Sequence, residues 1–308
     1  MTRFLVTGAS GLLGLNFCLQ NYRQHDLTGV VNSHLLPGAP FPVQQSDLSQ
    51  PGEIERLLDL ARPDLVVNCA AMANIDDCES EPERSWQLNV DFPRALAKAC
   101  AKSGIRLIHL STDAVFDGLR GDYSETDEPN PRGVYASHKL SAERAVLEAL
   151  PEALVARVNF YGWSLFGQRS LAEFFYYNLS ERKPVNGFTD VHFCPLEVTL
   201  LGENLLHLVQ KGCSGLYHVV SSENLTKYEF GLALAERFAL DGSLIHPVSV
   251  RESGLRAARS PDLRLRTDKL MAALGQPAPR QADGMQRFHA LFQSGYPQLV
   301  RDVARLTR

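Results

Sequence analysis

Residues 6–14 read Val-Thr-Gly-Ala-Ser-Gly-Leu-Leu-Gly, with a glycine at every third position from residue 8. A short apolar segment at 3–7 precedes this stretch, and an apolar pattern with helical spacing follows it from 12 to 22. In such a strand–turn–helix unit the glycines permit a tight turn, a close approach of a pyrophosphate and the packing of helix on strand. The helix N-terminus adds N–H donors. The stretch therefore indicates a dinucleotide-binding turn, with a chance turn as the alternative.

The alternation of strands and helices continues to about residue 161. We predict strands at 3–7, 27–31, 65–68, 105–110 and 154–158, and helices at 12–22, 51–61, 82–103 and 134–149. Strands that alternate with helices at this spacing form a parallel sheet with helices on both faces. The predicted fold class is therefore α/β, with a doubly wound parallel sheet of the Rossmann type.

The pattern becomes less regular after residue 162, which suggests two regions. We expect 1–161 to form the dinucleotide-binding Rossmann domain, completed by a strand near 215–220. We expect 162–308 to form mainly a smaller C-terminal α/β region that binds the substrate. In open sheets of this kind, ligands bind beyond the carboxyl ends of the strands, so the second region should pack there.

The composition excludes several classes of protein. The chain has 308 residues, 44% hydrophobic and 21% charged, which are ordinary globular values. It contains no apolar run of about 18 residues and no signal-like segment before the first strand, so we expect a cytoplasmic protein without a membrane partner. The six cysteines form no CxxC pair and no cluster with zinc spacing, so we expect reduced thiols and no metal.

The charge is unevenly distributed. The net charge is −4, yet residues 251–308 hold eleven Lys and Arg against five Asp and Glu. This basic segment suits either an anionic substrate, such as a diphosphate, or a solvated helix surface. Few aromatic residues lie between the arginines, so we expect no nucleic-acid partner.

The end of the second predicted strand should contact the adenosine ribose of the dinucleotide. Residues 30–34 read Val-Val-Asn-Ser-His and contain no acid to select NAD by its 2′-hydroxyl. They contain no arginine for a 2′-phosphate either, so we expect NADPH, or NADH as well. Asp47 follows a predicted short strand and either cradles adenine with Leu48 or caps a helix.

Small residues end the third predicted strand, at Cys69-Ala70-Ala71, and permit a close approach of the cofactor. The complete set of predicted cofactor-binding residues is Gly8, Ser10, Gly11, Leu12, Leu13, Gly14, Asn32, Ser33, Asp47, Leu48, Cys69, Ala70, Ala71, Ser111, Tyr135 and Lys139.

Tyr135 and Lys139 are four positions apart, which places them on one face of the predicted helix at 134–149. The ammonium should favour the phenolate and lower the pKa of the tyrosine towards working pH. Thr112 ends the strand before this helix, where its hydroxyl can bind a substrate carbonyl opposite the phenol. A phenol that exchanges a proton with this oxygen, beside a hydride carrier, is typical of a carbonyl reductase. Asn89, in the preceding helix, is a candidate for supporting a proton path.

Two further stretches carry a family resemblance. Residues 111–118 read Ser-Thr-Asp-Ala-Val-Phe-Asp-Gly, and 123–131 read Tyr-Ser-Glu-Thr-Asp-Glu-Pro-Asn-Pro, leading into the Tyr-x-x-x-Lys pair. With the glycine turn, they make the chain resemble the extended short-chain dehydrogenase/reductase superfamily, and within it the dTDP-4-dehydrorhamnose reductases. The resemblance runs from residue 2 to about 162, and more thinly to about 275. Thr112, Tyr135 and Lys139 fall on the family's catalytic positions.

The resemblance implies NAD(P)H-dependent reduction of a nucleotide-activated 4-keto-6-deoxy sugar at C4, with Tyr135 as the proton donor. It also implies a homodimer, as is common among relatives. The substrate positions that it suggests are Met72, Thr112, Asp113 and Asn159. Nucleotide-sugar dehydratases of the superfamily usually carry Asp then Glu after the threonine, and here Ala114 replaces the Glu, so dehydration is disfavoured.

The chain departs from the reductase pattern on the sugar side, which keeps two alternatives open. Residues 157–162 read Arg-Val-Asn-Phe-Tyr-Gly and lack the family's tryptophan, while Asn159 is typical of sugar-nucleotide epimerases. One alternative is a nucleotide-sugar 4-epimerase. The other is a non-catalytic NADP-binding regulatory subunit, similar to the beta subunit of methionine adenosyltransferase.

Overall fold

The computed structural model describes residues 1–167, 169–252 and 260–305. Its centre is a sheet of seven parallel strands in the order β11-β6-β5-β4-β1-β2-β3. These strands are β1 (Arg3–Thr7), β2 (Asp26–Val31), β3 (Val43–Gln45), β4 (Leu65–Asn68), β5 (Arg106–Thr112), β6 (Leu154–Val158) and β11 (Gly215–His218). The α/β fold with a doubly wound parallel sheet is thus confirmed, and the strand expected near 215–220 lies beside β6.

The central strands are buried on both faces, which explains their nearly continuous apolar sequences. All four residues of β4 (Leu-Val-Val-Asn) are buried. The register aligns Thr7 and Asn68, which end β1 and β4, with His109 in the middle of β5. The Thr7 hydroxyl donates to Asn68 Oδ1 (2.7 Å), and Asn68 Nδ2 lies 3.0 Å from His109 Nδ1. Burial lowers the pKa of His109, so its neutral ring accepts the bond from Asn68.

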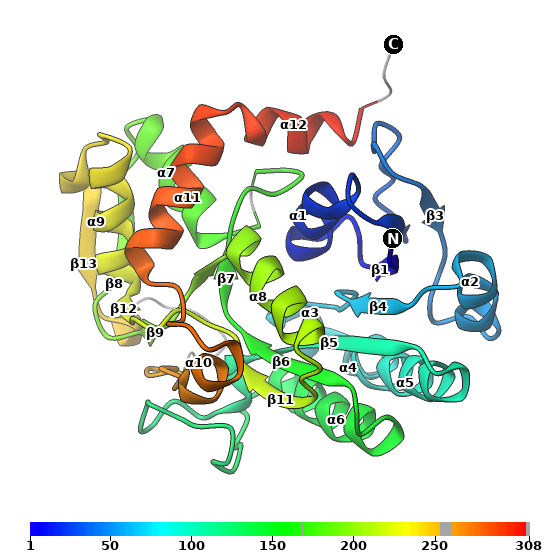
Figure 1. Ribbon diagram of the computed structural model, residues 1–308. Coiled ribbons are helices and arrows are strands. Elements are labelled where there is room, and N and C mark those ends of the chain that lie inside the picture. Colours follow the sequence, from blue (N-terminus) through cyan, green and yellow to red (C-terminus); the bar gives the residue numbers. More distant parts are fainter. Residues whose placement is uncertain (168, 253–259, 306–308) are drawn as a thin grey trace.

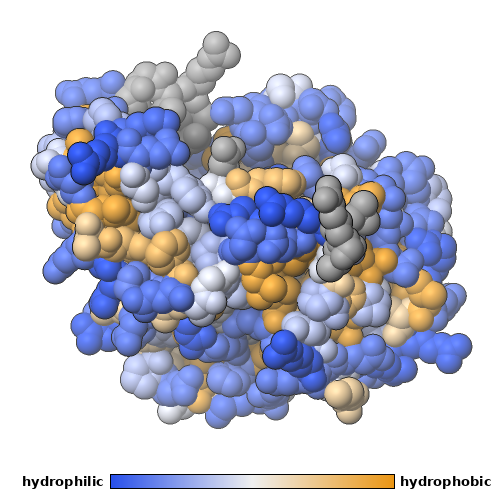
Figure 2. Space-filling view, turned by 90° about the horizontal axis from the view of Figure 1, so that it is seen from above, coloured by the Kyte–Doolittle hydropathy of each residue, from blue (hydrophilic) through white to orange (hydrophobic). Residues whose placement is uncertain are grey.

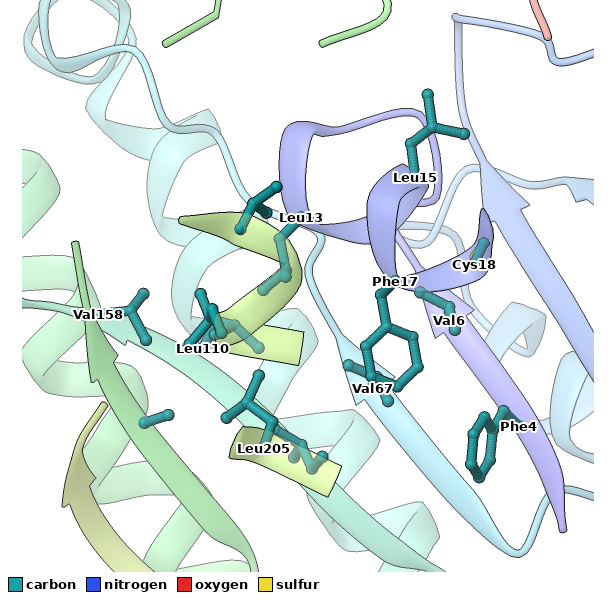
Figure 3. Packing of buried hydrophobic residues seen from close by; sticks show 14 of the residues in the cluster. Phe4, Val6, Leu13, Leu15, Phe17, Cys18, Val67, Leu110, Val158 and Leu205 are labelled. Atoms are coloured by element: carbon teal, nitrogen blue, oxygen red, sulfur yellow. The ribbon is translucent and has the colours of Figure 1, made fainter. Parts of the chain in front are cut away.

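Helices cover both faces of the sheet (Figure 1). α1 (Leu12–Asn21) and α8 (Val198–Gln210) pack on one face, and α2 (Glu53–Ala61), α5 (Phe92–Ser103) and α6 (Val134–Ala149) pack on the other. Figure 3 shows Phe17 of α1 directed at Val67 of β4, and both side chains are fully buried. Burial of one such side chain contributes about 2 kcal/mol. This packing fixes α1, and with it the glycine turn, against the sheet.

The helix predicted at 82–103 is continuous in direction but changes its hydrogen bonding in the middle. α4 (Pro82–Trp86) is followed by a π-helical turn (Gln87–Asp91) and then by α5. The N–H of Phe92 donates to the carbonyl of Gln87, five residues earlier. The next residue, Pro93, has no N–H, so it cannot make the ordinary bond to residue 89. The π turn therefore accommodates the missing N–H of Pro93, and Asn89 within it is buried.

The C-terminal region has its own core beside the sheet. It contains α7 (Leu171–Ser180), β8 (Val185–Phe188), α9 (Lys227–Arg237), β13 (Ile245–Val248) and α11 (Gln281–Gln293), which appear at the left of Figure 1. Their buried residues form one cluster around Trp163 and Phe230. Three two-stranded sheets stabilise it: β7 (Phe160–Tyr161) with β10 (Leu196–Glu197), β9 (His192–Phe193) with β12 (Leu225–Thr226), and β8 with β13.

The last described helix returns to the first half of the chain. α12 (Tyr296–Asp302) follows α11 and runs towards the segment between β2 and β3 (Figure 1). The Tyr296 hydroxyl donates to Asn16 Oδ1 (2.9 Å), and Gly38 N donates to the carbonyl of Val303 (2.9 Å). These two hydrogen bonds tie α12 and the residue that follows it to the first half of the chain. The remaining short helices are α3 (Ile75–Ser80) and α10 (Asp268–Leu274).

Hydrophobic residues show at the surface only in patches between hydrophilic ones in the view from above (Figure 2). Among the described residues, no helix combines the length and the apolar character that a bilayer crossing needs.

Candidate active site

The turn after β1 requires glycine at two positions. Gly8 has φ of +66°, and a Cβ there would lie 2.7 Å from the N of Ala70. A Cβ on Gly14 would collide with the carbonyl oxygen of Gly8. Gly11 precedes α1, and within the described residues no side chain caps that helix. The first N–H groups of α1 therefore face outward from a turn that has no room for side chains, an arrangement that suits an anion.

A cleft of two connected compartments lies along this turn. The β2-side compartment is lined by Gly8, Ser10, Val30, Val31, Asn32, Ser33, His34, Ser46, Leu48, Leu88 and Phe92. The α6-side compartment is lined by Leu12, Leu13, Gly14, Asn68, Ala73, Leu110, Ser111, Tyr135, Lys139, Val158 and Phe160. Both compartments share Gly11, Cys69, Ala70, Ala71 and Arg169. The cleft thus brings together every residue predicted to contact a cofactor except Asp47.

Asp47 uses its carboxylate within the chain. Its Oδ1 accepts from the N–H (3.1 Å) and hydroxyl (2.7 Å) of Ser49, and its Oδ2 accepts from Gln50 Nε2 (3.0 Å). These hydrogen bonds lower the pKa of Asp47. The side chain stabilises the turn at residues 47–50, while Leu48 lines the cleft. The helix-capping alternative is wrong, because the N-cap of α2 is Gly52 and no described side chain caps that helix. The adenine-binding alternative for Asp47 therefore has no support in this geometry.

Tyr135 and Lys139 are held by the first turns of α6. The chain enters this helix through Gly133, at φ of +87°, and the N–H of Val134 donates to Glu79 Oε1 (2.8 Å). Tyr135 and Lys139 then follow on one face, and both line the α6-side compartment. Lys139 is only 3% exposed, and burial lowers its pKa to about 8, opposed by the negative charge of Glu143.

The expected effect of Lys139 on Tyr135 is wrong. The pKa of Tyr135 is raised, not lowered, first by burial and then by the negative charge of Asp113. Lys139 is not among the groups that shift it, whereas a hydrogen bond with the Thr112 side chain opposes the rise. Desolvation thus outweighs any stabilisation of the phenolate. Tyr135 is therefore a neutral phenol at neutral pH, which is the form that donates a proton.

Thr112, Asp113 and Asn159 form one cluster beside Tyr135. The Thr112 hydroxyl donates to Asp113 Oδ1 (3.1 Å), and Asn159 Nδ2 donates to Asp113 Oδ2 (2.6 Å). Asp113 is buried, which raises its pKa to about 6, while these hydrogen bonds and the charge of Lys227 oppose the rise. The cluster brings together three of the four predicted substrate residues and connects them with Tyr135.

None of the four predicted substrate residues is among the described lining residues of the two compartments. The fourth of them, Met72, belongs to the segment after β4. Its N–H donates to Asn89 Oδ1 (2.9 Å), and its carbonyl accepts from Asn89 Nδ2 (3.0 Å). Asn89 Nδ2 also donates to Ser85 Oγ (3.1 Å). The amide of Asn89 therefore holds the segment after β4, and the proton path stays a prediction.

A buried ion pair behind the α6-side compartment was not anticipated. Glu143 accepts from Arg157 Nε (2.9 Å) and Nη2 (2.7 Å), and from the hydroxyl of Ser111. The Arg157 guanidinium also lies 4.8 Å from the centre of the Phe116 ring. The signal in the sequence is the eight-residue spacing between Tyr135 and Glu143, which puts the carboxylate on the same helix face one turn beyond Lys139.

Arg169 is a further residue that sequence reasoning missed. This exposed residue lines both compartments, although it belongs to the region that we assigned to the substrate. An isolated arginine in an irregular stretch gives no pattern from which this position follows.

The basic segment at 251–308 behaves mostly as a paired surface. Residues 253–259 and 306–308 lie outside the described residues. Ion pairs engage five of the other arginines: Arg264 with Asp262, Arg266 with Asp268, Arg280 with Glu223, Arg287 with Glu203, and Arg305 with Asp302. This geometry corresponds to the solvated-surface alternative. The described part of the chain has no cluster of His, Cys, Asp and Glu suited to a metal ion, and its six cysteines are free.

The sequence matches the family described as RmlD substrate binding domain over residues 2–294. A probable low-salt glycan biosynthesis reductase of Haloferax volcanii is 33% identical over 293 residues, 93% of this chain and 97% of that protein. A dTDP-4-dehydrorhamnose reductase of Mycobacterium tuberculosis is 34% identical over 265 residues, covering 84% and 83%. The methionine adenosyltransferase 2 subunit beta of Rattus norvegicus is 31% identical over 297 residues, covering 90% and 84%.

Solved structures agree in fold. A dTDP-4-dehydrorhamnose reductase of Bacillus anthracis, in complex with NADP, superposes with a TM-score of 0.84 over 94% of this chain and 99% of that one, at 24% identity. A hypothetical dTDP-4-dehydrorhamnose reductase of Sulfolobus tokodaii superposes with a TM-score of 0.81 over 92% and 98%, at 29% identity. At 24% identity, the first likeness bears on the fold alone.

Proposed function

Because this chain belongs to the RmlD substrate binding domain family of the extended short-chain dehydrogenases/reductases, we propose that it reduces a nucleotide-activated 4-keto-6-deoxy sugar with NADPH or NADH. One arrangement carries the proposal. Tyr135, a neutral phenol hydrogen-bonded with Thr112, lies in the same compartment as Lys139 and the end of the glycine turn.

The cleft fits a dinucleotide. Gly8 and Gly14 leave no room for a Cβ, so the backbone and the start of α1 are open to a pyrophosphate. Asn32 and Ser33 stand at the end of β2, where no acid repels a 2′-phosphate. When bound, NADPH or NADH supplies a hydride to the ketone carbon.

The side chains of the cluster provide the proton and the charge. Tyr135 donates its proton to the oxygen that gains negative charge, and Thr112 provides a second hydroxyl beside it. Lys139 is a buried cation in the same compartment and stabilises negative charge that develops there. Ala114 stands where a dehydratase needs a carboxylate base, so the same set of residues does not support loss of water.

The test mixes the purified chain with NADPH and a dTDP-4-keto-6-deoxyhexose and follows the near-ultraviolet absorbance of the reduced nicotinamide. We expect a steady loss of absorbance. Tyr135→Phe should lower kcat by about 10²- to 10⁴-fold and leave NADPH binding nearly unchanged. Tyr22→Phe is the matched control, because the Tyr22 hydroxyl accepts only from the neighbouring exposed Arg23 among its described contacts. No absorbance loss with several such sugars would contradict the proposal.

One alternative function has a specific observation behind it. The match to methionine adenosyltransferase 2 subunit beta spans 90% of this chain, so a binding subunit without turnover is the second candidate. NADPH that is bound but never oxidised, together with a stoichiometric protein partner, would favour it.

A 4-epimerase would convert its sugar without net loss of NADPH, which product analysis distinguishes from reduction.

A further inference from the structure

The turn between β7 and α7 is built around a buried carboxylate. Glu173 is 1% exposed and accepts from the N–H (2.7 Å) and hydroxyl (2.7 Å) of Ser164, and from the N–H groups of Arg169 (3.0 Å) and Ser170 (3.3 Å). The Ser170 hydroxyl donates to the carbonyl of Gly162 (2.8 Å). Four hydrogen bonds to one carboxylate fix the backbone at residue 169 relative to α7.

The fixed turn extends from the C-terminal region to the dinucleotide cleft. Phe166 packs against His34, just after β2, with ring centres 5.1 Å apart. Arg169 lines both compartments, together with the shared residues Gly11 and 69–71. Since these shared residues include the middle of the glycine turn, Arg169 stands at the junction of the two compartments.

Charge distinguishes Arg169 from the other lining residues. Among the described residues of the β2-side compartment, no other Lys, Arg, Asp or Glu lines the space. In the α6-side compartment the only other such residue described is Lys139, on α6. A dinucleotide carries two negative charges at its pyrophosphate, which the glycine turn places at the junction. An arginine there provides a full positive charge and a planar set of N–H donors, which the turn's backbone alone lacks.

We infer that Arg169 binds the pyrophosphate of the dinucleotide, so that the C-terminal region supplies a cation to the cofactor site in addition to Lys139. The inference rests on the proposed function, because it assumes a dinucleotide in this cleft. We expected residues 1–161 to bind the cofactor and residues 162–308 mainly to bind the substrate. If the inference holds, the second region contributes to cofactor binding as well.

The test compares Arg169→Gln with the wild type in titrations with NADPH and with NADH. Arg169 holds the turn through its backbone N–H, so the substitution leaves those hydrogen bonds in place. We expect the dissociation constants for both dinucleotides to rise by the same factor, about 10-fold or more. The affinity of the wild type should fall more steeply with added salt than that of the variant, because salt screens the ion pair.

Arg237→Gln is the matched control, since it removes an exposed arginine near the end of α9, and it should bind both dinucleotides like the wild type. Arg169→Lys should recover part of the affinity. Unchanged binding by Arg169→Gln would overturn the inference, and so would a loss confined to NADPH, which would assign the arginine to the 2′-phosphate. A wild-type chain that binds neither dinucleotide would instead overturn the proposed function.

Discussion

Glu143 of α6 and Arg157 of β6 form a buried ion pair, with Oε2 and Nη2 2.7 Å apart and both side chains 3% exposed. The pair lies directly behind the α6-side compartment, because Ser111, which lines that compartment, donates its hydroxyl to Glu143. Glu143 also opposes the lowering of the pKa of Lys139. The ion pair therefore connects the stability of the fold with the electrostatics of the cleft.

Glu143→Gln should destabilise the protein strongly. Removing one charge of a buried pair leaves the other uncompensated, which costs about 3–5 kcal/mol. Urea unfolding measures the change. Arg144→Gln, which breaks the neighbouring ion pair with Glu128 on the exposed side of the same helix, should cost less than about 1 kcal/mol. Similar losses in the two variants would contradict the role of the buried pair.

The pKa of Lys139, lowered to about 8, predicts a pH dependence of dinucleotide binding. The side chain is an ammonium below this value and a neutral amine above it, so its attraction for phosphate and developing negative charge is lost as pH rises through about 8. The dissociation constant for NADPH should increase over that range. Lys139→Arg keeps the positive charge at all these pH values, so the dissociation constant of this variant for NADPH should stay constant between pH 7 and 9. An equally steep loss of NADPH affinity in this variant would show that a group other than residue 139 titrates.

The elements and the cleft follow from local patterns in the sequence, and this is why most of them could be predicted. The glycine spacing of 8, 11 and 14 and the apolar strands each depend on neighbours close in sequence. The direction of the Tyr135 pKa could not be read in the same way. It depends on burial and on Asp113, which lies 22 positions away along the chain.

Arg169 and Arg157 show the same limit for charged residues. No local sequence pattern predicts that Arg169 lines the cleft or that Arg157 pairs with Glu143. Both depend on residues that are distant in sequence and come close only in the folded protein. The π turn at Gln87–Asp91 is different, because Pro93 marks it in the sequence, but helical periodicity alone does not separate it from a continuous helix.

Gly14→Ala tests the glycine turn. The new Cβ would meet the carbonyl of Gly8 at a distance that real Cβ atoms do not adopt, so the backbone of α1 must move away from the turn. We expect the variant to lose most of its affinity for NADPH and to unfold at a lower temperature than the wild type. In Gly242→Ala the nearest atom to the new Cβ is 3.4 Å away, an ordinary contact, so this variant should keep both properties. A Gly14→Ala protein that binds NADPH normally would contradict the assignment of the turn.

Glu197 should make the stability of the protein depend on pH. It is fully buried, caps α8 through Oε2, and its Oε1 has no hydrogen-bond partner among the described residues. Burial raises its pKa from about 4.5 to about 7, opposed chiefly by the hydrogen bonds from Thr199 and Leu200. The folded state thus prefers the protonated carboxyl. Its contribution is fully present below pH 4.5 and is lost as pH rises through about 7, a change on the order of 3 kcal/mol.

Glu197→Gln isolates this effect, because the amide keeps an oxygen for the cap but does not ionise. We expect the variant to be more stable than the wild type at pH 8, by on the order of 3 kcal/mol, and to have little advantage at pH 4.5. Free energies of unfolding in urea at the two pH values give the comparison, and other titrating groups cancel because both proteins contain them. If the difference between variant and wild type is the same at pH 4.5 and pH 8, the carboxyl of Glu197 does not titrate between them, and its burial does not govern its charge.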